Sequence, residues 1–182
     1  PELQSERDLR ETQANYFGMI TEIDTSLGLL FDALETTSQW NETVIVFSSD
    51  HGEYLGDHYL TGKGHIYDSG MRVPLIVRDP SRAADTTRGR TLDGFAESID
   101  IAPTILKACG IEPDTAMSGL DLRKPQALAH RDRIFVDVYW DATTVIADRD
   151  HTVGSQIKLD PVCMTRDDFV HGIVENFCCQ VV

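Results

Sequence analysis

The stretch Thr43–His58 reads TVIVFSSDHGEYLGDH and changes abruptly from an apolar run to a cluster of carboxylates and imidazoles. Residues 43–47 are mostly β-branched and show no polar alternation, which predicts a short strand buried on both faces, as in a parallel sheet. Asp50 and His51 follow directly, and open α/β sheets bind ligands beyond the carboxyl ends of their strands. The order of these features favours a metal or ligand site at the end of a buried strand.

Asp50 and His51 offer one carboxylate oxygen and one imidazole nitrogen. This pair suits Zn²⁺ or Mn²⁺, whereas a site dominated by oxygen would favour Ca²⁺ or Mg²⁺. Consecutive strand residues point to opposite faces, so both side chains can meet one ion only if the chain bends, and Gly52 gives it that freedom. The calcium-loop pattern and the helical H-E-x-x-H motif are both absent. An acidic surface loop is the alternative interpretation.

Lys63 follows in the segment LTGKGHIYDSG, residues 60–70, with Gly62 and Gly64 on either side. The two glycines allow the backbone and the ammonium group to approach a ligand closely. A pair of metal ligands together with a lysine is suited to neutralise charge on a tetrahedral oxyanion. Taken alone, Lys63 would be read as a solvent-exposed loop residue.

The surrounding segments predict an α/β fold. Apolar residues in steps of three and four predict a helix, with Asp24 off its apolar face. Those residues are Tyr16, Ile20, Ile23, Leu27, Leu30 and Leu34. A second strand is expected at Val73–Val77, a helix at residues 100–110 between Pro103 in its first turn and Gly110 at its end, and a further strand at Arg133–Trp140. A long helix that leads into a short buried strand is typical of a wound α/β unit.

The bulk composition excludes two classes of partner. The 182 residues carry a formal net charge of −14, which argues against nucleic acid and against anionic membrane surfaces. No apolar run is long enough to span a membrane. The four cysteines show neither a metal-ligand spacing nor a disulfide framework. There is no initiator Met, so we expect a fragment or a processed chain, whose localisation the sequence leaves unknown.

A longer segment, IVFSSDHGEYLGDHYLTGKGHIYDSGMRVPLIVRDP (residues 45–80), resembles the second signature of the sulfatase family in the alkaline phosphatase superfamily. It is particularly similar to the arylsulfatase and phosphonate monoester hydrolase branch. The residues ANYFGMITEIDTSLGLLFDAL (14–34) are similar to the helix that precedes the metal strand of that family. SIDIAPTILKACGI (98–111) is similar to its downstream helix. The likeness extends over roughly residues 10–140.

The resemblance implies part of an alkaline phosphatase-like wound α/β sheet sandwiched by helices, which we place at residues 1–127. Residues 128–182 are expected to hold the start of a smaller C-terminal subdomain and an unassigned tail. The substrate implied is a small anionic ester, and a homo-oligomer is left open.

The same resemblance implies the roles of individual residues. Asp50 and His51 become ligands of a divalent metal, Ca²⁺ or Mn²⁺/Zn²⁺, and Lys63 contacts the sulfuryl or phosphoryl group and its leaving oxygen. His58 and His65 are candidates for the pocket. The loop itself is expected to be capped or oriented by the carboxylates of Glu53 and Asp57. Arg72 is expected to hold the same loop through a pair with a carboxylate.

Family members use a formylglycine nucleophile made from a C/S-x-P-x-R motif, and no such motif occurs here. Residues 79–82, Asp-Pro-Ser-Arg, match only its last part, and Cys163 to Arg166 lacks the proline. The chain is therefore interpreted as the C-terminal part of a sulfatase-type enzyme, without its nucleophile. Two alternatives are a non-catalytic fragment or decayed relative that serves as a structural or interaction module, and a phosphomutase or phosphodiesterase of the same superfamily.

Overall fold

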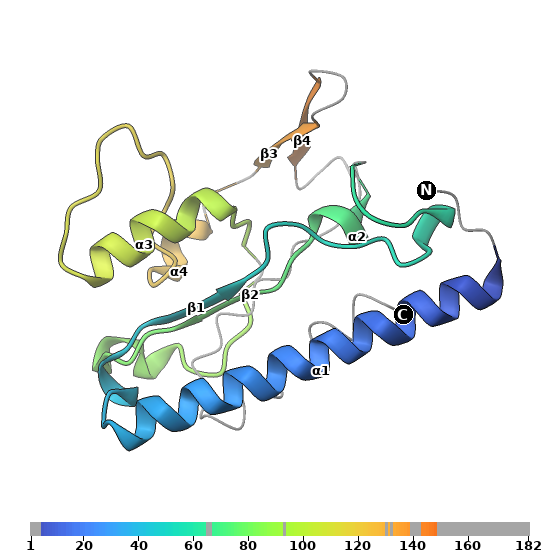
Figure 1. Cartoon of the computed structure of the whole chain (residues 1–182). Helices are drawn as coiled ribbons and strands as arrows, with labels where there is room; N and C mark the ends of the chain where they lie inside the picture. Colours follow the sequence, from blue (N-terminus) through green and yellow to red (C-terminus); the bar gives the residue numbers. More distant parts are fainter. Residues whose placement is uncertain are drawn as a thin grey trace.

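The computed structural model describes residues 5–64, 67–92, 94–129, 131, 133–138 and 143–148, the last two segments by their backbone alone. The helices are α1 Glu6–Thr36, α2 Asp68–Met71, α3 Ile101–Ala108 and α4 Pro125–Leu128. The strands are β1 Ile45–Ser48, β2 Leu75–Arg78, β3 Arg133–Val138 and β4 Thr143–Asp148. Short 3₁₀ turns lie at Trp40–Glu42, Asp57–Tyr59, Arg82–Thr86 and Ser98–Asp100. Figure 1 shows β1 and β2 between α1 on one side and α3 and α4 on the other.

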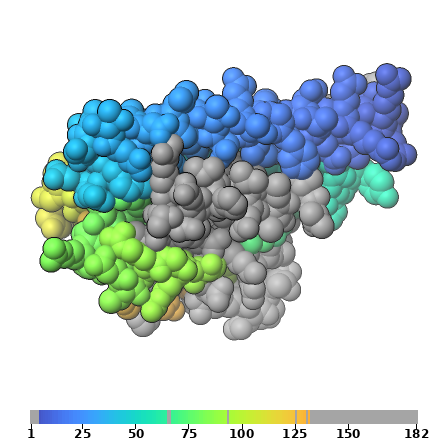
Figure 2. Space-filling view, turned by 90° about the horizontal axis from the view of Figure 1, so that it is seen from below, coloured from blue at the N-terminus to red at the C-terminus, as the bar shows by residue number. Residues whose placement is uncertain are grey.

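Helix α1 begins after Ser5, whose hydroxyl accepts a hydrogen bond from the Asp8 amide at 3.2 Å. This N-cap satisfies one of the free amides of the first turn, where Glu6 and Asp8 also complement the helix dipole. In Figure 2 the helix extends along one edge of the molecule, from one end of the view to the other. The predicted helix at residues 16–34 is therefore confirmed and extends further at its N-terminal end.

The apolar face of α1 differs from the predicted one at two positions. Ile23 and Leu30 are 44% and 53% exposed, whereas Phe31 is fully buried and Asp24 is half-buried. Asp24 therefore lies on the inner side, contrary to the prediction. The Phe31 ring packs edge-on against Trp40, with 5.3 Å between the ring centroids. Burying this larger aromatic ring rotates the inner face by one residue at these two turns.

Strands β1 and β2 pair antiparallel, with Ile45 opposite Arg78 and Ser48 opposite Leu75. The prediction of a parallel arrangement for this strand is thus wrong for the neighbour that the structure describes. All four residues of β1 are half-buried, whereas all four of β2 are buried. Burial of β1 on both faces is confirmed only in part: Val46 packs against one hydrophobic cluster and Ile45 and Phe47 against the other, but none of them is fully buried.

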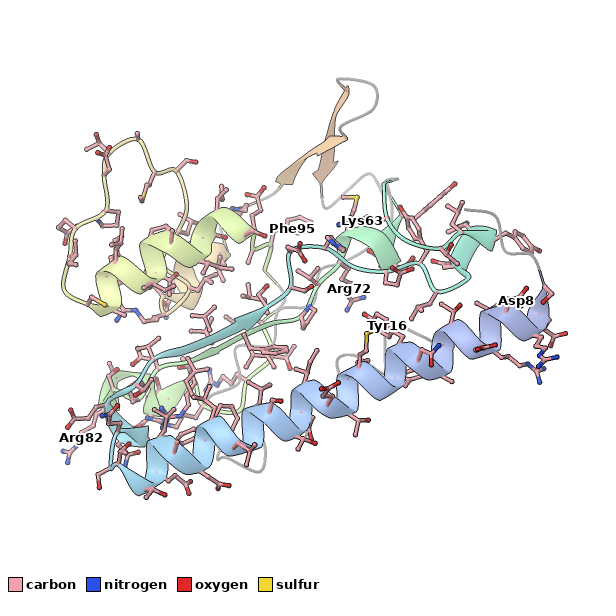
Figure 3. All side chains as sticks on the ribbon, in the orientation of Figure 1. Asp8, Tyr16, Lys63, Arg72, Arg82 and Phe95 are labelled. Atoms are coloured by element: carbon pink, nitrogen blue, oxygen red, sulfur yellow. The ribbon has the colours of Figure 1, made fainter. Side chains whose placement is uncertain are left out.

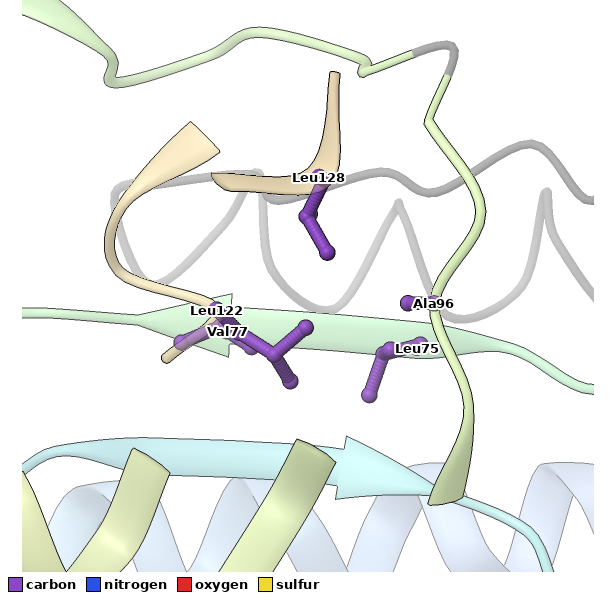
Figure 4. Packing of buried hydrophobic residues seen from close by; sticks show 5 residues of the cluster. All are labelled: Leu75, Val77, Ala96, Leu122 and Leu128. Atoms are coloured by element: carbon purple, nitrogen blue, oxygen red, sulfur yellow. The ribbon is translucent and has the colours of Figure 1, made fainter. Parts of the chain in front are cut away.

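The two faces of β2 belong to different hydrophobic clusters. On one face Ile76 packs with Phe31 of α1. On the other face the cluster consists of Leu75, Val77, Ala96, Leu122 and Leu128, as Figure 4 shows. This alternation follows from the two-residue period of a strand, and it fixes β2 between α1 and the segments around α3 and α4.

A buried carboxylate joins three segments near α3. Asp100 accepts hydrogen bonds from both terminal nitrogens of Arg131, at 2.6 and 2.8 Å, and from the amide of Leu120 at 2.6 Å. Burial lowers the pKa of Arg131, but its hydrogen bonds to Asp100 and the charges of Asp100 and Glu97 outweigh burial and raise the pKa overall. Helix α3 ends at Ala108, and Gly110, the predicted stop, follows two residues later with a φ of +74°.

The strand predicted at residues 133–140 is present as β3. It pairs antiparallel with β4, a strand that the sequence did not indicate, from Arg133 opposite Asp148 to Val138 opposite Thr143. The expectations for the tail, including Cys163, fall outside the described residues. Within the described residues no helix is both long and apolar enough to cross a membrane.

Candidate metal and oxyanion site

The imidazole of His51 is oriented by its own chain neighbour. Its Nδ1 atom lies 2.8 Å from the carbonyl oxygen of Gly52, which can only accept a hydrogen bond. Nδ1 therefore donates to this carbonyl, and Nε2 is the ring nitrogen left to face another group. This is the arrangement by which histidine ligands in metal sites are usually held.

Asp50 divides its two oxygens in a similar way. Oδ1 accepts a hydrogen bond from the His51 amide at 3.0 Å, and Oδ2 lies 3.5 Å from Nε2 of His51. Two donors placed about 2.1 Å from a tetrahedral Zn²⁺ lie roughly 3.4 Å apart. Two donors about 2.4 Å from Ca²⁺ at right angles have roughly the same spacing. The pair thus fits a single divalent ion of either kind.

The described residues supply only these two donors. No group of three or more His, Cys, Asp or Glu side chains in the described part of the chain could hold an ion together. The carboxylate of Asp50 is 85% exposed and the ring of His51 is 38% exposed, so both are open to further ligands.

The ammonium group of Lys63 contacts Nε2 of His51. Three polar atoms therefore meet here: Asp50 Oδ2, His51 Nε2 and Lys63 Nζ. Lys63 lies between Gly62, with φ +82°, and Gly64, with φ +123°. A Cβ atom at either glycine would meet nothing within 4 Å, so the backbone conformation and not lack of space requires glycine. In Figure 3 Lys63 lies beside α2 at the end of the sheet.

Gly52 has a different purpose from the one predicted. Its φ is not in the left-handed region, but a Cβ atom there would lie 2.0 Å from the carbonyl oxygen of Ser69. Its amide also donates to the carbonyl of Gly70 at 2.9 Å. Gly52 is therefore needed for the close approach of two backbone segments, which brings the residues after β1 against α2.

The loop between β1 and α2 is braced by its own polar groups. Asp57 accepts a hydrogen bond from the Ser69 hydroxyl at 2.6 Å, and Glu53 accepts one from the amide of Gly62. Both carboxylates therefore orient the loop, as the sequence predicted. Gln13 of α1 donates to the carbonyl of Leu55 at 2.9 Å and ties the loop to the helix.

His58 stacks on Tyr67, with ring centroids 3.8 Å apart and an angle of 15° between the planes. Tyr67 in turn meets the buried Tyr54 edge-on at 6.1 Å. His58 has a φ of +50°, a left-handed conformation that is costly for a residue with a side chain. None of these contacts brings His58 to Asp50 or Lys63, so its role in the pocket stays a prediction. His65 falls outside the described residues.

Arg72 pairs with Asp68 one helical turn earlier, with 3.8 Å between Nη1 and Oδ2. Burial raises the pKa of the Asp68 carboxyl, Arg72 lowers it by a smaller amount, and the charge of Asp57 raises it again. The sequence did not single out Asp68 or Tyr67. The available signal for Tyr67 was its position, since an aromatic residue four positions after Lys63 lies in the same loop and could contact it.

The partial nucleophile motif at residues 79–82 lies far from this site. Figure 3 shows Arg82 at the opposite end of the sheet from Lys63. Ser81 is in a turn in which its amide donates to Asp79 at 2.8 Å. The described residues thus bring together Asp50, His51 and Lys63, and they leave the motif-like segment at a distance.

Comparisons with known proteins agree with this geometry. The sulfatase family profile matches residues 3–111. The multifunctional alkaline phosphatase superfamily protein PehA of Trinickia caryophylli is 41% identical over 145 residues, which cover 75% of this chain and 28% of that protein. An arylsulfatase of Clostridium perfringens is 34% identical over 119 residues, which cover 65% of this chain and 25% of that protein.

A solved structure agrees as well. The phosphonate monoester hydrolase SpPMH from Silicibacter pomeroyi superposes with a TM-score of 0.61 and 32% identity, over 73% of this chain and 26% of that one. The chain thus spans about a quarter of the length of the relatives that it matches. Its α/β elements belong to the alkaline phosphatase-like fold of these hydrolases. The family profile covers more than half of the 182 residues, and the chain belongs to the sulfatase family.

Proposed function

We propose that this chain supplies half of the metal and oxyanion site of a divalent-metal-dependent hydrolase that cleaves sulfate, phosphonate or phosphate monoesters. The observation that carries the proposal is the convergence of Asp50 Oδ2, His51 Nε2 and Lys63 Nζ at the end of β1. The names of the relatives, an arylsulfatase and a phosphonate monoester hydrolase, support the substrate class.

In this proposal Asp50 and His51 hold the ion, Zn²⁺, Mn²⁺ or Ca²⁺, through Oδ2 and Nε2. The bound ion would polarise an ester oxygen and stabilise negative charge. The ammonium group of Lys63 lies at Nε2 of His51 and would face the oxygens of the anionic group. Its ammonium group is a compact charge on a flexible stem, so it can leave His51 Nε2 and neutralise charge that develops on the leaving oxygen.

The nucleophile belongs to the part of the proposal that rests on family resemblance. The sequence holds no C/S-x-P-x-R motif, so the formylglycine expected for the family would come from residues other than these 182. We therefore expect the chain by itself to bind metal weakly and to show no turnover.

Metal binding by the 182-residue chain tests the proposal directly. We expect Mn²⁺ titration, followed by the electron paramagnetic resonance of the free ion, to show one site. Asp50→Ala and His51→Ala should each weaken it by more than about tenfold. His58→Ala is the matched control, because it removes an exposed imidazole of the same loop and should leave the affinity within about twofold. Equal loss in all three variants, or no saturable site in the wild type, would refute the proposal.

Activity separates the proposed role from the alternatives. The chain is mixed with a chromogenic aryl sulfate or an aryl phosphonate monoester in the presence of Mn²⁺ or Ca²⁺. Saturable metal binding without turnover supports half a site. Turnover that disappears in His51→Ala would mean that a nucleophile lies within these residues, and it would contradict that reading. Neither binding nor turnover would favour a non-catalytic module.

A further inference from the structure

We infer that Glu53 is a positioning residue for Lys63: its carboxylate holds the backbone immediately before the lysine and so aims the ammonium group at the metal ligands. The inference rests on the proposed function for the role of Lys63, but the contacts of Glu53 stand independently of it. Glu53 lies two residues after His51 and nine residues before Gly62, so it joins the two parts of the site across the loop.

The first step is the contact itself. Oε1 of Glu53 accepts a hydrogen bond from the Gly62 amide at 2.5 Å and a longer one from the Leu55 amide at 3.4 Å. A hydrogen bond from an amide to a carboxylate is shorter and stronger than one between neutral groups. The side chain is half-buried, where such a bond is weakened less by water than it would be on the surface.

The second step is that Gly62 is held from both sides. While its amide donates to Glu53, its carbonyl accepts from the amide of Tyr54 at 3.0 Å. Tyr54 is the residue after Glu53 and is buried. The two bonds together pin Gly62 to the chain that leaves β1. The conformation of Gly62, φ +82°, then sets the direction in which Lys63 leaves it.

The third step concerns what would happen without the carboxylate. No atom lies within 4 Å of the place that a Cβ atom would take at Gly62 or Gly64, and Lys63 itself is exposed. Glycine backbone is conformationally permissive, so this short segment depends on its hydrogen bonds to stay in place. A displacement of about 1 Å in a positioned group can reduce a reaction rate by about a hundredfold.

The charge of Glu53 also acts on α1. Burial raises the pKa of the Tyr16 phenol, and the negative charge of Glu53 raises it further. Figure 3 shows Tyr16 on α1 below the loop that carries Lys63. The hydrogen bonds of the carboxylate to the amides of Leu55 and Gly62 link the chain that leaves β1 to the glycine before Lys63.

The test uses the full 182-residue chain and two variants that differ in one property. Glu53→Gln keeps an acceptor oxygen at the same reach, whereas Glu53→Ala removes it. Glu22→Ala, on the exposed face of α1, controls for the loss of one negative charge. The first readout is hydrogen exchange of the Gly62 amide. We expect it to accelerate by about tenfold or more in Glu53→Ala, but by less than about threefold in Glu53→Gln and Glu22→Ala.

The second readout is the paramagnetic broadening that Mn²⁺ causes in the nuclear resonance spectra of the His51 ring and of the Lys63 side chain. This broadening falls steeply with distance from the ion. In Glu53→Ala we expect the His51 signals to broaden as in the wild type and the Lys63 signals to broaden much less, while Glu53→Gln restores the wild-type ratio. A general loss of structure would instead change both residues.

The outcomes separate the two claims. Unchanged Gly62 exchange and unchanged Lys63 broadening in Glu53→Ala would overturn the positioning role. If Mn²⁺ broadens neither residue in any variant but Gly62 exchange still depends on the acceptor oxygen, Glu53 holds the loop and the metal site is wrong. If Glu53→Gln behaves like Glu53→Ala in both readouts, the acceptor oxygen is not the cause and the inference fails.

Discussion

The Nδ1–H group of His51 donates to the main-chain oxygen of Gly52 at 2.8 Å, so the direction of the imidazole is set by the next residue in the chain. The ring therefore cannot rotate freely to follow an ion, and Nε2 is the nitrogen that it offers. In the proposed site, the kind of donor at position 51 would therefore influence which ion is preferred.

Replacing this donor should change the preference among ions. We expect the wild-type chain to bind Zn²⁺ more tightly than Ca²⁺, because imidazole nitrogen suits the softer ion. His51→Asp gives two carboxylates and should shift the ratio of the two affinities toward Ca²⁺ by about tenfold or more. Competition between the two ions, measured by calorimetry, checks this. An unchanged ratio would mean that His51 does not bind the ion.

The close approach at Gly52 predicts a contrast between two glycine substitutions. Gly52→Ala places a methyl group against the Ser69 carbonyl, and overpacking of this kind costs about 1–3 kcal/mol of unfolding free energy. Gly18 lies in α1, and a Cβ atom there would have no neighbour within 4 Å. Gly18→Ala should therefore raise the unfolding free energy by about 0.5–1 kcal/mol. Urea unfolding of both variants measures the difference. The two changes having the same sign would contradict the packing described here.

Asp68 predicts a dependence of stability on pH. Burial raises its pKa above the unfolded value of 3.8, despite Arg72, so the charged carboxylate is disfavoured in the folded chain. Its contribution to stability is full below the unfolded pKa and is lost as the pH rises through the folded pKa. Asp68→Asn should therefore unfold at a higher temperature than the wild type at pH 7.

This advantage of Asp68→Asn should disappear toward pH 3.5, where the wild-type carboxyl is protonated as well. Thermal unfolding of both proteins across this range gives the difference directly. Asp114→Asn, at an exposed carboxylate for which no such burial exists, is the control. A gain that stays constant with pH would show that the ionisation of Asp68 is not its source.

Two ion pairs of the chain should respond very differently to truncation. Asp100→Ala leaves the guanidinium of Arg131 without its buried carboxylate, and breaking a buried pair costs about 3–5 kcal/mol. Glu6→Ala removes the pair with Arg10, whose side chains are both more than three quarters exposed, and should cost less than about 1 kcal/mol. Chemical denaturation compares them. Similar losses would mean that the Asp100 carboxylate is not buried as described.

Local patterns in the sequence were sufficient for much of the fold. The positions of β1, β2, α1, α3 and β3 follow from apolar periodicity, proline placement and terminal glycines, which are properties of a few adjacent residues. The strand direction of β1 and β2 could not be obtained in this way, because it depends on how the loop through α2 returns to the sheet. The inner face of α1 was predicted wrongly at Ile23 and Asp24 for a similar reason. That face is set by the packing of Phe31 on Trp40, a residue outside the helix.

The candidate site was predictable to the same extent. Asp50, His51 and Lys63 could be selected from residue type and spacing, and the structure brings them together. The bond from Gly62 to Glu53 could not be foreseen as a specific contact, because it depends on a loop that folds back over nine residues. The reason for glycine at position 52 was also hidden, since Ser69 is far away in the sequence.

The hydrogen bonds of Asp100 have a practical consequence for anyone who wishes to shorten the protein. The boundary predicted between residues 127 and 128 falls before Arg131, the guanidinium that neutralises this carboxylate. It also separates Leu128 from the cluster on β2. A version cut at that point would expose an unpaired anion and an apolar hole in the part that is kept. Useful end points for a shorter recombinant protein therefore lie beyond residue 131, even if β3 and β4 are dispensable.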